Sequence, residues 1–367
     1  MLSLVHGAYF YVLVCSLLLG MLLTPAVRRL ALRFGVLDHP SGRKDHREPT
    51  PLLGGLAIFL CFHLVIGAHL AAFYYFQQTG IRFLYSELVE LLGENAFVQV
   101  TGILAGGLVV FILGVVDDVR HLTPWVKLLG QFAAGGILLL SGIQIKGFIF
   151  ENDWLSYLAT LAWVVLIVNS LNLLDNMDGL CGGVSIIAAL SFFLAVNPDD
   201  YLVRLVLMAF VGAVGGFLYH NFHPARIFMG DAGSMFCGYM LATIAVLGTY
   251  HTQTTPSPVA VAAPLVALSV PLFDTLSVVY IRWRLGHPLM QGDKRHFSHR
   301  LVDLGMSTRQ AVTFIYLVGG VCGLGAALLP HLDFVGTGVV LVQILGIYML
   351  VILLMNVQKN GVPRREK

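Results

Sequence analysis

Four polar side chains lie three residues apart in an otherwise apolar stretch, LIVNSLNLLDNMDGLCGG, at residues 166–183. They are Asn169, Asn172, Asp175 and Asp178. Carboxylate and amide oxygens of this kind are ligands for a hard divalent cation. On a helix the first three span about 120° and can face one cavity, and we expect Asp178 to follow the helix end. The alternative for Asn169 is a hydrogen bond to a neighbouring helix.

Two further segments carry carboxylates. Asp117 and Asp118 are adjacent in VVDDVRH, and such a pair favours either a bound cation or the capping of the start of the next helix. Asp231 follows a glycine in MGDAGS, where backbone N–H groups could approach phosphate oxygens or the aspartate could cap a helix. Both segments therefore have a chemical and a structural interpretation.

A basic segment, DKRHFSHR, lies near the C-terminus. Its Arg295, His296 and His299 suit a diphosphate, although the same charges could only contact lipid head groups. Carboxylates for Mg²⁺ together with cations for phosphates indicate phosphoryl transfer between a soluble nucleotide and a lipid.

The elements that must position these residues are membrane-spanning helices. The chain is 57% hydrophobic and only 11% charged, whereas soluble domains carry about 25% charged residues. The sequence predicts a single all-α domain over residues 1–367, a polytopic membrane helix bundle of about 10–11 transmembrane helices. The apolar runs are 8–26, 53–76, 98–116, 128–142, 156–174, 180–196, 202–219, 232–250, 258–281, 309–328 and 336–355.

The distribution of Lys and Arg predicts the orientation of the bundle. Of the 22 such residues, only Arg82, Lys146 and Arg204 lie on one side. The positive-inside rule then puts the N-terminus outside and the C-terminus in the cytoplasm. The expected active-site loops share the cytoplasmic face, at residues 27–52, 117–127, 169–183, 220–234 and 282–308.

Five segments in order resemble the motifs of one enzyme family. They are RKDHREPTPLLGG, VVDDVRH, NSLNLLDNMDGLCGG, PARIFMGDAGS and DKRHFSHR. The chain resembles the polyprenyl-phosphate N-acetylhexosamine-1-phosphate transferases, and their WecA/TagO branch more closely than their MraY branch.

The resemblance implies transfer of a HexNAc-1-phosphate, with GlcNAc as the expected sugar, from a UDP-N-acetylhexosamine to undecaprenyl phosphate with release of UMP. It further implies a Mg²⁺ cofactor, with Mn²⁺ as an alternative, and a place in the bacterial inner membrane that initiates a cell-envelope polysaccharide. The bilayer is an expected partner, nucleic acid is not, and a homodimer is compatible with the sequence.

The resemblance also implies roles for individual residues. Asp231 and Asn172 would bind the metal, and Asp178 and Phe228 would bind uracil. The remaining assignments are Asp117, Asp118 and Asp175 beside the reacting phosphates, Lys44 and Lys127 on phosphates, and Arg295, His296 and His299 on the diphosphate. Asn169 is assigned either to substrate binding or to helix packing.

Three positions depart from the family motifs. His121 replaces the last carboxylate of DDxxD, Asn176 replaces the glycine after the first Asp of DGxDG, and Ser298 replaces a histidine of HxHH. The alternative within the family is the MraY reaction on UDP-MurNAc-pentapeptide. The alternative of another class is a secondary transporter, which would place its acids near mid-membrane in paired, broken helices.

Overall fold

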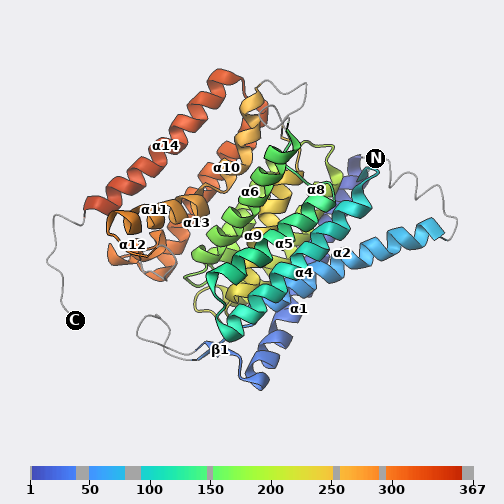
Figure 1. The fold of residues 1–367 in the computed structure, drawn as a ribbon, viewed down its shortest axis with the longest axis horizontal. Helices are drawn as coiled ribbons and strands as arrows, with labels where there is room; N and C mark the ends of the chain where they lie inside the picture. Colours follow the sequence, from blue (N-terminus) through green and yellow to red (C-terminus); the bar gives the residue numbers. More distant parts are fainter. Residues whose placement is uncertain are drawn as a thin grey trace.

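The computed structural model describes residues 2–38, 49–78, 92–146, 152–250, 257–288 and 295–357. Within these ranges the chain forms a bundle of long helices with one two-residue strand pair (Figure 1). The elements are α1 (Leu2–Phe34), β1 (Leu37–Asp38), β2 (Thr50–Pro51), α2 (Gly54–Gln78), α4 (Ala96–Arg120), α5 (Pro124–Leu140), α6 (Asp153–Leu174), α7 (Leu180–Ala195), α8 (Tyr201–Asn221), α9 (Gly230–Leu247), η1 (Pro258–Ala262), α10 (Ala263–Ala267), α11 (Ser269–Arg284), α12 (Phe297–Asp303), α13 (Thr308–Leu328), η2 (Leu329–His331) and α14 (Phe334–Val357).

Eight of the described helices are long and apolar enough to cross a membrane, or nine if one bent pair counts as a span. Helices α5 and α7 are also apolar but have only 17 and 16 residues. The predicted all-α membrane bundle is therefore confirmed. Which side of the bundle faces the cytoplasm remains a prediction.

Some predicted boundaries were wrong. The run 258–281 is not one straight helix, because its two parts meet at an angle of 69° beside Leu268. Pro264 and Pro271 flank this break, and proline removes a backbone donor and clashes with the preceding turn. Asp117 and Asp118 lie in the last turn of α4, although residues 117–127 were expected to form a loop.

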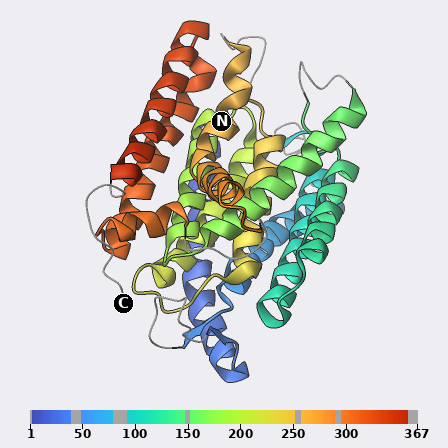
Figure 2. The same ribbon diagram turned by 60° about the vertical axis from the view of Figure 1, so that its left-hand side comes forward.

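Helix α9 is the centre of the bundle. In its apolar window 83% of the residues are buried, compared with 17% in α14. It packs against α2, α4, α6 and α7, whereas α14 lies at the periphery beside α13 (Figures 1 and 2). Small residues permit this packing: an added Cβ on Gly114 of α4 would lie 2.3 Å from Ala232 Cα of α9.

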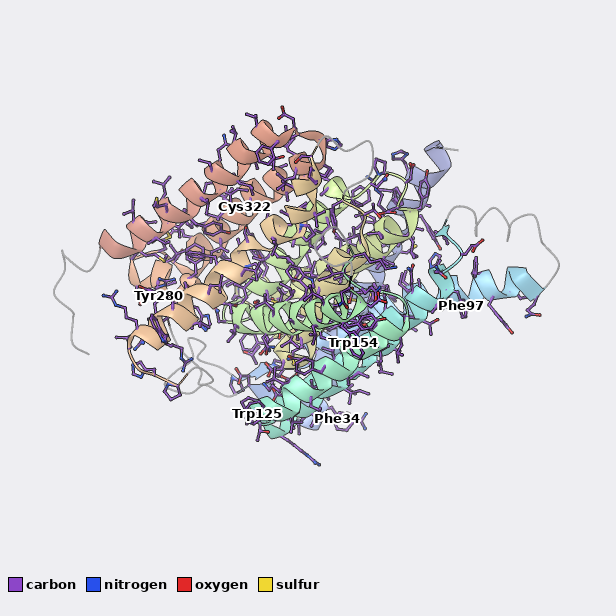
Figure 3. All side chains as sticks on the ribbon, turned by 45° about the horizontal axis from the view of Figure 1, so that its top comes forward. Phe34, Phe97, Trp125, Trp154, Tyr280 and Cys322 are labelled. Atoms are coloured by element: carbon purple, nitrogen blue, oxygen red, sulfur yellow. The ribbon has the colours of Figure 1, made fainter. Side chains whose placement is uncertain are left out.

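The outer surface of the bundle is apolar, as a lipid environment requires. Trp125 and Trp154, in the first turns of α5 and α6, expose 73% and 75% of their surface (both labelled in Figure 3). Because α5 and α6 run in opposite directions, these two indoles lie toward opposite ends. Tryptophan at such places is typical of membrane–water interfaces.

Candidate active site

The chemistry-bearing residues meet at one end of the bundle. Helices α4, α6 and α8 finish at this end and α5, α7 and α9 begin there, and we refer to it as the site end. The segment that follows β2 reaches the same place, because Gly54 N and Gly55 N donate hydrogen bonds of 2.8 Å to the carbonyls of Phe228 and Met229. Segments far apart in the sequence therefore surround the first turn of α9.

Asp231, in that first turn, is the residue on which other helices converge. Lys127 Nζ, from α5, donates to its Oδ2 at 3.0 Å, and Asn172 Nδ2, from α6, donates to its Oδ1 at 2.9 Å. Asn172 also donates to Ser234 Oγ at 3.0 Å. Because 35% of the Asp231 side chain is exposed, its carboxylate remains open to a ligand.

Asp117 shares the lysine with Asp231. The Lys127 ammonium group forms an ion pair with Asp117 Oδ2, and Asp117 Oδ1 accepts from Leu122 N at 2.7 Å. Asp117 is almost fully buried, with 3% of its side chain exposed. One ammonium group therefore lies between two carboxylates that come from different helices.

Asp118 is bound to the backbone of α9. Its Oδ1 accepts from Asp231 N at 2.7 Å and its Oδ2 accepts from Ala232 N at 3.1 Å. This is the capping alternative weighed for the pair, although the capped helix is α9, not the next helix, α5. Gly230 has a φ of +72°, and an added Cβ would lie 2.7 Å from Asp118 Oδ2, so the contact requires glycine there.

Asp175 directly follows the last residue of α6, and other carboxylates lie close enough to oppose its ionisation. Burial raises the pKa of its carboxyl well above the usual range, and the negative charges of Asp231, Asp118 and Asp178 raise it further. Among the described residues its side chain makes no hydrogen bond. A cation placed between these carboxylates would relieve the repulsion.

The donor set fits a hard divalent cation. Asp231 and Asn172 offer carboxylate and amide oxygens, and Asp175 adds a carboxylate that lacks a partner among the described residues. Within the same part of the chain, no group of three His, Cys, Asp or Glu residues could hold a metal ion alone. Water or substrate oxygens would have to complete the coordination, which is the arrangement that Mg²⁺ favours.

Asp178 lies in the break between α6 and α7, beyond the helix end as predicted. Its Oδ2 accepts from His223 Nδ1 at 2.8 Å and from Ala225 N at 3.1 Å. Among the described residues its Oδ1 accepts no hydrogen bond. Phe228, half-buried, follows the same 223–225 turn, and its backbone N donates to Pro51 O at 2.8 Å.

Residues 297–300 of the basic segment form the first turn of α12, and His296 directly precedes it. His296 Nδ1 contacts Asp274 Oδ2 at 2.8 Å, and Phe297 N donates to Asp274 Oδ1 at 2.6 Å. Asp274, buried in α11, therefore fixes the orientation of the His296 ring. The sequence alone is compatible with this role for Asp274 or with a hydrogen bond that packs helices together. Arg295 and His299 flank His296, one on each side along the chain.

Asn169 is directed toward a different neighbour from Asn172. Its Nδ2 donates to Gln131 Oε1 at 2.7 Å, and Gln131 Nε2 returns a longer bond of 3.4 Å to Asn169 Oδ1. The pair joins α5 to α6, which is the helix-packing alternative.

His121 is exposed and ends α4 with a φ of +46°. Lys44 lies outside the described residues.

Sequence reasoning missed three residues near this site. Ser234 lies within the quoted MGDAGS motif, so its position was available as a signal. Gln131 offered only its polarity within an apolar helix, and His223 only its place beside PARIFMGDAGS. Their partners become evident only when the helices are assembled.

Comparison with known proteins adds a further finding. The family described as glycosyl transferase family 4 matches residues 100–249. A probable undecaprenyl-phosphate N-acetylglucosaminyl 1-phosphate transferase of Bacillus subtilis (strain 168) is 34% identical over 324 residues, which cover 86% of this chain and 83% of the relative.

Two further relatives carry related names. A decaprenyl-phosphate N-acetylglucosaminephosphotransferase of Mycobacterium tuberculosis (strain CDC 1551 / Oshkosh) is 34% identical over 333 residues, with 83% of this chain and 78% of the relative covered. An undecaprenyl-phosphate alpha-N-acetylglucosaminyl 1-phosphate transferase of Escherichia coli (strain K12) is 27% identical over 333 residues, which cover 87% of this chain and 83% of the relative.

Proposed function

The chain belongs to glycosyl transferase family 4, and from that premise we propose that it transfers GlcNAc-1-phosphate from UDP-GlcNAc to undecaprenyl phosphate. The products are a lipid-linked pyrophosphate sugar and UMP, and the reaction begins a cell-envelope polysaccharide. Because the relatives are named as transferases, the transporter alternative is dropped. The MraY reaction has less support, since the relatives described above are named for GlcNAc, not MurNAc-pentapeptide.

The observation that carries this proposal is the convergence on Asp231. A carboxylate pair bridged by Lys127 and an amide from Asn172 bring oxygen ligands and a cation to one place. A reaction between two phosphate groups requires both, because every reactant is anionic. The site end also lies where membrane-spanning helices finish, within reach of a lipid phosphate and a soluble nucleotide.

In the proposed mechanism the lipid phosphate attacks the donor in line. A phosphomonoester with a second pKa of about 6 is largely dianionic at neutral pH, so no strong base is needed. Asp117 then serves to hold Lys127, whose ammonium group neutralises phosphate charge during transfer. Mg²⁺, or Mn²⁺ in its place, would be held by Asp231 and Asn172 and would supply further charge neutralisation.

In this proposal, the uracil and the diphosphate of the nucleotide sugar are bound by different segments of the chain. Asp178 Oδ1 is available to accept a hydrogen bond from uracil, and Phe228 would stack on the base. His296, with Nδ1 engaged by Asp274, would present Nε2 to the diphosphate beside Arg295 and His299. We place the site on the cytoplasmic side of the bacterial inner membrane, because soluble UDP-sugars are made there and Lys and Arg are concentrated at this end.

The test is a reaction with purified components. Detergent-solubilised protein with Mg²⁺, undecaprenyl phosphate and UDP-GlcNAc should release UMP, and EDTA should stop the release. Asp231→Asn should abolish it while the thermal unfolding profile stays cooperative. A panel of UDP-GlcNAc, UDP-GalNAc and UDP-MurNAc-pentapeptide separates the donor alternatives. Absence of UMP with every donor would contradict the proposal.

A further inference from the structure

Two of the three positions that depart from the family motifs touch each other. Ser298 Oγ donates a hydrogen bond to Asn176 Oδ1 at 2.5 Å, across 122 residues of sequence. Asn176 Nδ2 donates in turn to Leu173 O at 2.9 Å. The amide is therefore bound at both atoms, and its oxygen must face Ser298.

The Ser298 hydroxyl depends on this partner. Its residue is 1% exposed, and a buried hydroxyl without a hydrogen bond is costly. A glycine at 176, as in the family motif, would leave no side chain to accept the bond. In this chain the short serine at 298 and the longer asparagine at 176 reach each other.

The contact links the two parts of the proposed donor site. Asn176 follows Asp175 directly and lies two residues before Asp178, in the break between α6 and α7. Ser298 lies in α12, which has only seven residues, between His296, which directly precedes the helix, and His299 within it. Two printed contacts tie the same segment to α11: Asp274 binds His296 and Phe297, and Ser277 Oγ accepts from Arg300 Nη2 at 2.9 Å. The Asn176–Ser298 hydrogen bond joins α12 to the break between α6 and α7.

We propose that Asn176 and Ser298 form a positioning pair that sets His296 and His299 relative to Asp175 and Asp178, and so tunes binding of the nucleotide sugar. This inference rests on the proposed function. Neither residue needs to touch the donor. The pair acts on the distance between the uracil-binding end and the diphosphate-binding end of one substrate.

Kinetics of single and double variants test the pair. Ser298→Ala and Asn176→Ala should each raise KM for UDP-GlcNAc about 3- to 10-fold, the effect of one lost hydrogen bond, with KM for undecaprenyl phosphate unchanged. The double variant should raise KM for UDP-GlcNAc no more than either single variant does, because each substitution removes the same hydrogen bond. Ser298→Thr keeps the hydroxyl and should recover most of the donor affinity.

Ser156→Ala is the matched control. Ser156 is also 1% exposed and its hydroxyl donates a 2.5 Å bond, to Ile145 O, at the opposite end of the bundle. It should lower thermal stability as much as Ser298→Ala and leave both KM values unchanged. A merely structural role for the pair would give Ser298→Ala the behaviour of this control, and that result would overturn the inference.

A second measurement separates this inference from the proposed function. Amide hydrogen exchange should increase in residues 175–180 and 296–303 together in Ser298→Ala, whether or not the protein turns over UDP-GlcNAc. If the wild-type protein releases no UMP but this coupled exchange is seen, the proposed function fails and the pair remains. If UMP is released and the two segments exchange independently, with additive KM effects, the pair is wrong and the function stands.

Discussion

Asp118 Oδ1 accepts a hydrogen bond of 2.7 Å from the backbone N–H of Asp231. A carboxylate at the end of α4 thus fixes the first turn of the central helix, across 113 residues of sequence. The other carboxylate oxygen accepts from Ala232 N, so both oxygens of Asp118 lie at the positive N-terminal end of α9 and neutralise it. One acid of the DD pair holds the backbone, and the other holds Lys127.

The Asp118 contact predicts a combined loss of stability and activity. Asp118→Ala should destabilise the protein by about 1–3 kcal/mol, because two backbone donors lose their partner. Asp118→Asn keeps one acceptor oxygen and should lose less. Thermal unfolding in detergent measures the first effect and UMP release the second. An unchanged unfolding midpoint in Asp118→Ala would contradict the capping role.

Lys127 should be required for catalysis, and both its positive charge and its compact ammonium group should contribute. Lys127→Met leaves Asp117 and Asp231 without their shared cation, and we expect kcat/KM to fall by about 100-fold or more. Lys127→Arg keeps the charge but not the compact ammonium group, and should be intermediate. Lys146→Met, an exposed lysine at the opposite end, is the control and should be neutral. Equal activity in Lys127→Met and Lys146→Met would remove Lys127 from the mechanism.

The sequence predicted the fold class, and it singled out several residues that the structure brings together at the site end. Apolar runs separated by polar segments identify a membrane bundle without further information. We expected Asp178 to follow the helix end, and α6 does end before it, at Leu174. The structure then brings Asp117, Lys127, Asn172 and Asp231 into contact.

The rest depended on tertiary contacts. From the sequence, α5 was the expected helix for a cap by the Asp117–Asp118 pair, because α5 directly follows it. The packing of α4 on α9 makes α9 the helix that Asp118 caps. The bend at Leu268 could not be predicted from the prolines near it, since transmembrane helices tolerate proline when neighbouring groups satisfy the backbone. Asn169 shares the spacing of Asn172 but bonds Gln131, because α5 lies within reach of it.

Asp274 should be a positioning residue for His296. Asp274→Asn retains one acceptor for two donors, His296 Nδ1 and Phe297 N, and so loosens the ring. We expect kcat/KM for the donor to fall about 10- to 100-fold, as for other carboxylates that orient a functional histidine. Asp153→Asn, an exposed aspartate at the opposite end, should have no effect. Equal kinetics for the two variants would show that His296 does not need this partner.

Close packing of α2 on α9 predicts a sharp difference between two glycines of one helix. A Cβ on Gly55 would lie 2.2 Å from Gly233 N, whereas Gly67 has no described heavy atom within 4 Å of the same position. Gly55→Ala should cost about 1–3 kcal/mol and reduce UMP release, because it displaces the turn that carries Asp231. Gly67→Ala should be neutral or slightly stabilising. Equal unfolding midpoints for the two variants would contradict this packing.

Asp175 predicts how stability depends on pH. Burial and the charges of Asp231, Asp118 and Asp178 raise the pKa of its carboxyl, so the folded state holds its proton more tightly than the unfolded state. Ionisation therefore opposes folding, and this contribution to stability falls as pH rises from the ordinary range of an aspartate through the raised pKa. Asp175→Asn cannot ionise and should gain stability relative to wild type over that window.

The measurement is the unfolding midpoint of both proteins in EDTA from about pH 4 to pH 8, the range that spans the ordinary aspartate value and neutrality. The two curves should separate progressively as pH rises, with Asp175→Asn the more stable. Adding Mg²⁺ should narrow the gap, because a cation stabilises the ionised carboxylates of the wild type and the amide variant gains less from it. Parallel curves in EDTA would mean that Asp175 does not experience these charges, and a gap insensitive to Mg²⁺ would place the cation elsewhere.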